Sequence, residues 1–73
     1  MNKLEMNSIA DKFIADRGMP MSNYYIEVTP YSELICFKGE DGREYDLPIS
    51  DETLAIAVKK RLRELGVKVV ELK

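Results

Sequence analysis

Carboxylates are the side chains of this sequence that lie close enough together to suggest chemistry. They gather around one expected turn and at the start of an expected helix: Glu40, Asp41, Glu44, Asp46, Asp51 and Glu52. A calcium loop needs acids at alternating positions, a glycine at the sixth position and a bidentate acid at the twelfth, and the stretch EDGREYDLPISDE lacks this pattern. Paired acid and base catalysis needs an apolar cleft, of which the sequence gives no sign. We therefore interpret these acids as turn and helix-cap residues.

The other residue types exclude most remaining kinds of site. The chain has no histidine, so it lacks the usual general base and the commonest metal ligand. Its single cysteine, Cys36, supports neither a zinc site nor a Cys-His nucleophile. The four glycines form no phosphate-binding loop. These absences predict a protein that is not an enzyme and that uses no cofactor, metal or small-molecule ligand.

A basic cluster lies in the second expected helix. Lys59, Lys60 and Arg63 project opposite the apolar stripe of that helix, and Ile56 lies among them. One apolar residue ringed by cations could anchor an acidic partner or contact phosphates, whereas the simpler interpretation is a solvated face whose basic residues follow the helix dipole. The net charge of −2 gives no global attraction for nucleic acid. Nucleic acid is therefore the less favoured partner.

Two amphipathic helices are expected to carry these residues. From Met6 to Arg17 the apolar side chains that share one arc are Met6, Ile9, Ala10, Phe13 and Ile14. Asn7 or Ser8 can cap this helix, and Gly18 can end it in the left-handed conformation. The second helix is expected to start at Ser50 or Asp51 and to stop at Gly66, and its predicted buried residues are Leu54, Ala55, Val58, Leu62 and Leu65.

The remaining segments have the pattern of strands: NYYIEVTP, ELICFK with REYDL as a hairpin, and a final VKVVEL. If Gly42 takes the left-handed position of a three-residue turn, Phe37 faces Tyr45 and Ile35 faces Leu47, and these four side chains point to the core. A turn of two or four residues would shift the pairing by one and put Leu34 and Cys36 inside instead. The position of the glycine favours the first register, which leaves Leu34 and Cys36 on the outer face beside Glu44 and Asp46.

The element order α-β-β-β-α-β predicts an α+β fold. Each helix has one apolar stripe and most strands have one apolar face, so we expect a two-layer sandwich in which two helices pack on one face of a mostly antiparallel sheet. Residues 1–73 are expected to form a single small domain. The sequence has no membrane-spanning or signal-like run, and one cysteine is typical of a reducing compartment, so we predict a cytoplasmic protein without membrane contact.

The outer sheet face predicts a protein partner, because apolar side chains left in water there could be buried by a partner or by a second copy, and a homodimer is plausible. The expected contact residues are Tyr25, Leu34, Cys36, Glu44 and Asp46. We therefore expect a small interaction module or regulator that binds another protein or itself. The alternative is a nucleic-acid-associated regulator that uses the basic cluster, with Lys12 and Arg43. Small, acidic, cysteine-poor chains of this kind resemble the accessory proteins of bacteria.

Overall fold

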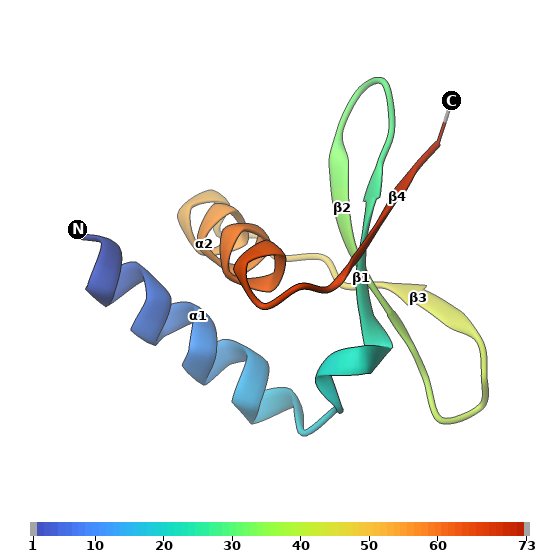
Figure 1. Cartoon of the computed structure of the whole chain (residues 1–73), viewed down its shortest axis with the longest axis horizontal. Helices are drawn as coiled ribbons and strands as arrows, with labels where there is room; N and C mark the ends of the chain where they lie inside the picture. Colours follow the sequence, from blue (N-terminus) through green and yellow to red (C-terminus); the bar gives the residue numbers. More distant parts are fainter. Residues whose placement is uncertain (1, 73) are drawn as a thin grey trace.

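The computed structural model describes residues 2–72 and has the predicted element order. The helices are α1 (Lys3–Arg17) and α2 (Glu52–Glu64), with one 3₁₀ turn, η1 (Met21–Asn23), between α1 and the first strand. The strands are β1 (Tyr24–Val28), β2 (Glu33–Lys38), β3 (Glu44–Asp46) and β4 (Lys68–Glu71). Figure 1 shows both helices on the same side of the sheet, so the predicted α+β sandwich is confirmed.

The two helices end where glycine predicts, but α1 begins earlier than expected. Gly18 and Gly66 have φ values of 71° and 84°, the left-handed region in which a side chain would be strained. The cap of α1 is Asn2, whose side chain accepts a hydrogen bond of 2.9 Å from the backbone N–H of Glu5, so the predicted start near Met6 is wrong. Asn2 offers the same capping chemistry as the predicted residues, and the sequence between them favours helix.

The sheet has the strand order β3-β2-β1-β4. β1 pairs antiparallel with β2 and parallel with β4, and β2 pairs antiparallel with β3. The favoured hairpin register is confirmed: Phe37 faces Tyr45, and the Gly39 N–H donates a 2.8 Å hydrogen bond to the carbonyl oxygen of Arg43. Gly42 has a φ of 81°, as the left-handed turn position requires. The final strand, whose partner the sequence left open, lies on the far side of β1.

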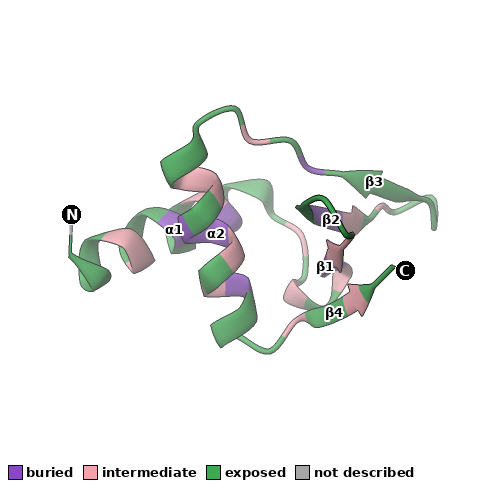
Figure 2. Cartoon of the chain, turned by 90° about the horizontal axis from the view of Figure 1, so that it is seen from above, coloured by how far each residue is buried: buried purple, intermediate pink, exposed green. Residues whose placement is uncertain are grey.

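The core fills the space between the helices and one face of the sheet (Figure 2). Its buried residues are Ala10, Ile14, Tyr24, Ile26, Ile35, Leu47, Ala57, Val58 and Leu62. Three residues predicted to be inside are largely exposed: Ile9, Tyr45 and Leu65, each at 42%. Tyr45 lies in the β2–β3 hairpin, which extends past the helices (Figure 1), and Ala57 rather than Leu65 completes the buried side of α2. Phe37 is half-buried for the same reason as Tyr45.

No helix among residues 2–72 combines the length and the apolar character that crossing a membrane requires.

Candidate functional site

The outer face of the sheet is the face that the helices leave uncovered (Figure 2). The strand registers place all five residues of the predicted interface on it: Tyr25, Leu34, Cys36, Glu44 and Asp46. Leu34 is 38% exposed, and Glu44 and Asp46 are exposed as well. These three side chains are therefore accessible to a partner.

Cys36 is not accessible, because its side chain is fully buried on this outer face. Its Sγ lies 3.5 Å from Oδ1 of Asp46 and 3.6 Å from Oε2 of Glu27, and a thiol can donate to one of these carboxylates at a time. Burial first, and then the hydrogen bonds and charges of the two acids, raise the pKa of Cys36 to about 12. The expectation that Cys36 would be exposed and contact a partner is thus wrong: neighbouring side chains cover it, and the thiol stays protonated at neutral pH.

The basic cluster of α2 is present as predicted, and it reaches the sheet. Ile56 is 50% exposed among Lys59, Lys60 and Arg63, and these residues line a hollow of about 280 Å³ together with Glu33 at the start of β2. The Nη2 atom of Arg63 lies 3.0 Å from Oε1 of Glu33. This ion pair neutralises part of the cluster and connects α2 to the edge of the sheet.

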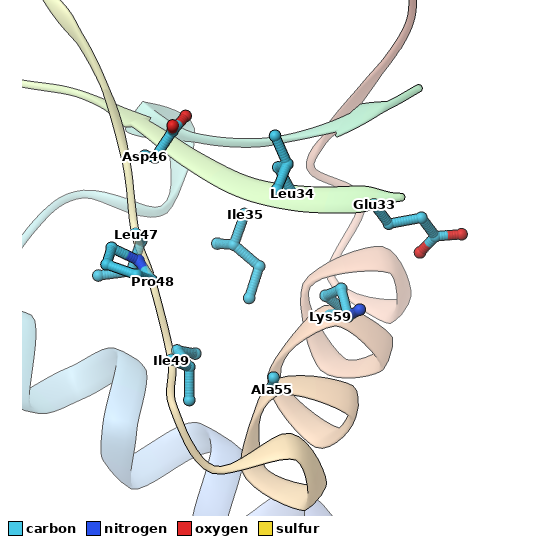
Figure 3. Close-up of a pocket in the computed structure, with 9 residues that line it drawn as sticks. All are labelled: Glu33, Leu34, Ile35, Asp46, Leu47, Pro48, Ile49, Ala55 and Lys59. Atoms are coloured by element: carbon cyan, nitrogen blue, oxygen red, sulfur yellow. The ribbon is translucent and has the colours of Figure 1, made fainter. Parts of the chain in front are cut away.

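A second hollow of about 310 Å³ adjoins the first and shares Glu33 and Lys59 with it (Figure 3). It lies between β2, the segment 46–49 that leaves the sheet, and the first half of α2. Its lining residues are Glu33, Leu34, Ile35, Asp46, Leu47, Pro48, Ile49, Ala55 and Lys59. Because the two hollows share a border, we treat them as one depression, the β2–α2 groove, with an apolar floor and charges on its rim.

The groove also exposes an edge of the sheet, because β3 is shorter than β2. The pairing of these strands ends with a 2.8 Å hydrogen bond from the Leu47 N–H to the carbonyl oxygen of Ile35, after which the chain turns toward α2. Alternate residues of an antiparallel strand direct their backbone groups to opposite sides, so the groups of Glu33 face the same way as those of Ile35. Among residues 2–72, the N–H of Ile35 and both backbone groups of Glu33 have no hydrogen-bond partner.

The groove thus unites residues that the sequence suggested for separate surfaces. Leu34 and Asp46 belong to the predicted interface, and the groove adds them to the whole of the predicted basic cluster. Sequence reasoning missed Glu33, Pro48 and Ile49. The one signal for them was the proline after Leu47, which is typical of a strand end.

Two other predicted contributors lie outside the groove. Lys12 is on α1, and Arg43 belongs to the β2–β3 turn, which points away from α2 (Figure 1). Within the described residues, no three His, Cys, Asp or Glu side chains are placed to hold a metal ion. The groove can therefore bind by apolar contact, by charge and by backbone hydrogen bonds.

The chain was compared with protein-family models, with curated proteins and with solved structures. None of the three comparisons finds a match. The argument for function therefore rests on the residues of the β2–α2 groove and on the free edge of β2 beside them.

Proposed function

We propose that this protein is a non-enzymatic interaction module that acts by binding another protein through the β2–α2 groove. The observation that supports this most is the combination, in one depression, of an apolar floor, an exposed isoleucine and three cationic side chains. Protein interfaces commonly have this composition, with apolar anchors at the centre and charged groups at the rim.

Ile56 is the central anchor in this proposal. At 50% exposure, its side chain leaves apolar area in water that a partner could bury, and Lys59 and Lys60 lie beside it. Complete burial of an isoleucine side chain contributes about 1.5–3 kcal/mol, so half of that is available to a partner. The lysines add charge attraction, which raises the association rate for an acidic partner more than it raises the affinity.

Nucleic acid has less support as the partner. Arg63 is already paired with Glu33, and Asp46 adds a second negative charge to the rim of the groove. A phosphate backbone would meet both acids when it approached Lys59 and Lys60. Phosphate binding depends on several unopposed cations, which this surface does not provide.

Photo-crosslinking in the cells that make the protein tests the proposal. A benzophenone side chain at position 56 is expected to give a covalent adduct with one main partner, which mass spectrometry of the adduct identifies. The matched control is the same side chain at position 9, because Ile9 is also a helical isoleucine with 42% exposure and lies outside the groove. Adducts of equal yield at both positions, or none at position 56, would contradict the proposal.

Light scattering over a wide concentration range completes the experiment. A mass that stays that of one chain supports a different protein as the partner. A dimer that the substitution Ile56→Glu dissociates, and Ile9→Glu does not, would replace the foreign partner by a second copy of the chain.

A further inference from the structure

We infer that the groove binds an extended, acidic segment of the partner, which adds a short strand to the free edge of β2. This inference rests on the proposed function and specifies the conformation and the chemistry of the bound segment. Three features of the described residues support it: unpaired backbone groups, an apolar hollow beside them, and an uneven distribution of charge along the rim.

The backbone supports strand addition. The Ile35 N–H and both backbone groups of Glu33 lie in one row on the side of β2 that β3 does not reach. Unpaired groups on a strand edge are a template for another strand, and recognition modules use such edges to bind extended peptides through main-chain hydrogen bonds. The row spans residues 33 to 35, which corresponds to about three residues of an added strand at roughly 3.3 Å per residue.

The hollow beside this edge determines which side chains fit. In an added strand, alternate side chains point to opposite faces of the sheet. On the helix side they meet Leu47, Ile49 and Ala55, so an apolar side chain is favoured there (Figure 3). On the outer side they lie beside Leu34, which is 38% exposed. The bound segment is therefore expected to have apolar residues, β-branched ones above all, along the length that pairs with β2.

The charges of the rim place the acidic residues of the segment. Lys59 borders both hollows, and Lys60 and Arg63 extend the positive charge beyond the start of β2. At the other end of the groove Asp46 is exposed and negative. An acidic residue is thus attracted at the Glu33 end, where it can also share the Arg63 guanidinium, and it is repelled at the Asp46 end. This predicts an acid at one end of the apolar stretch.

The first test uses a phage-displayed library of random twelve-residue peptides, selected on the full chain. We expect enrichment of peptides with alternating β-branched residues followed or preceded by Asp or Glu. The substitution Lys59→Glu should weaken their binding at least tenfold, whereas Lys12→Glu, the same change on α1 outside the groove, should leave it within a factor of two. Peptides without acidic residues, or binding that both substitutions weaken equally, would overturn the inference.

The second test examines the backbone. The exchange of the Ile35 amide hydrogen with deuterium should slow at least tenfold when a selected peptide binds, because that N–H then donates to the peptide. Methylation of the peptide nitrogen that pairs with β2 should weaken binding at least tenfold, and methylation of the next nitrogen should not. If peptides bind and depend on Ile56 and Lys59 but Ile35 exchange is unchanged, strand addition is wrong and the proposed function stands.

Failure of the library gives a different result. If no peptide is enriched but position 56 still gives its adduct in cells, the groove binds a folded surface rather than an extended segment. If neither is observed, the proposed function fails as well. A dimer in which the Ile35 amide is protected without any peptide would identify a second copy as the occupant and overturn the inference of a foreign segment.

Discussion

The native thiol of Cys36 should react slowly with a disulfide reagent at pH 8, although it lies on the uncovered face of the sheet. Its pKa rises from 9.0 to about 12, which lowers the thiolate fraction at a given pH about 1000-fold. A thiolate of higher pKa is a better nucleophile, and with a Brønsted coefficient of about 0.4–0.5 this recovers roughly 20-fold. The remaining factor is about 50, and complete burial of the side chain slows the reaction further.

The assay follows the absorbance of the thionitrobenzoate released from Ellman's reagent. The rate for the folded protein is compared with that in denaturant, where we expect a rate at least 50-fold higher. A double variant, Leu34→Cys with Cys36→Ala, is the matched control, since position 34 is on the same strand and face and Leu34 is 38% exposed. Its thiol should react close to the unfolded rate.

A rate for native Cys36 within a factor of three of the control would refute the reasoning. It would mean that the side chains of Glu27 and Asp46 do not cover the sulfur. The original expectation of an accessible cysteine in an interface would then return.

Three further perturbations test the packing, the turn and the titration of the same structure. Leu62→Ala should lower the free energy of unfolding by about 2–5 kcal/mol because Leu62 is fully buried, whereas Leu65→Ala, at 42% exposure, should cost less than about 1 kcal/mol; urea denaturation measures both, and equal effects would contradict the observed orientation of α2. Gly42→Ala should cost about 1 kcal/mol in the same assay because φ is 81° there, and an unchanged midpoint would exclude the left-handed turn. The pKa values of Cys36 and Tyr25 are both raised to about 12, so the unfolded chain loses these protons at lower pH than the folded chain does; stability should therefore fall as pH rises from about 9 to about 12, and less steeply in Cys36→Ala, as urea denaturation at pH 8 and pH 10.5 would measure. A flat profile, or the same slope in both proteins, would contradict the shifts.

Local chemistry accounts for the features that the sequence predicted correctly. Gly18, Gly42 and Gly66 all occupy left-handed positions, and the place of Gly42 determines the hairpin register and hence the face of Ile35. A glycine signals such a position because other residues are strained there. The boundaries and the order of the elements therefore followed from short stretches of sequence.

The features that were mispredicted depend on contacts between distant segments. Ile9 has the spacing of a buried residue, but the direction in which α1 leaves the sheet, which its own sequence does not encode, leaves it largely exposed (Figure 1). Cys36 was expected in water, and it is covered by the carboxylate side chains of Glu27 and Asp46 from both neighbouring strands. Charged side chains that cover an apolar atom with their stems give no pattern in a single sequence.

The candidate site was half predictable for the same reason. Helical spacing alone identified Ile56 and its three cationic neighbours, which are on one element. The groove beside them exists because β3 stops at Asp46 while β2 continues to Glu33, and the length of a strand pair is set by where the chain must turn to reach α2. The free edge could not be inferred before that length was known.

The parallel pairing of β4 with β1 has a consequence for the speed of folding. Both hairpins, β1–β2 and β2–β3, join neighbours in sequence, whereas β4 must return past α2 to reach Tyr25 and Ile26. Closing that longer loop costs more chain entropy, and contacts of large sequence separation slow folding. Until β4 docks, β1 is itself an edge strand with unpaired backbone groups, so the last strand both completes the sheet and protects the central strand from pairing with other chains.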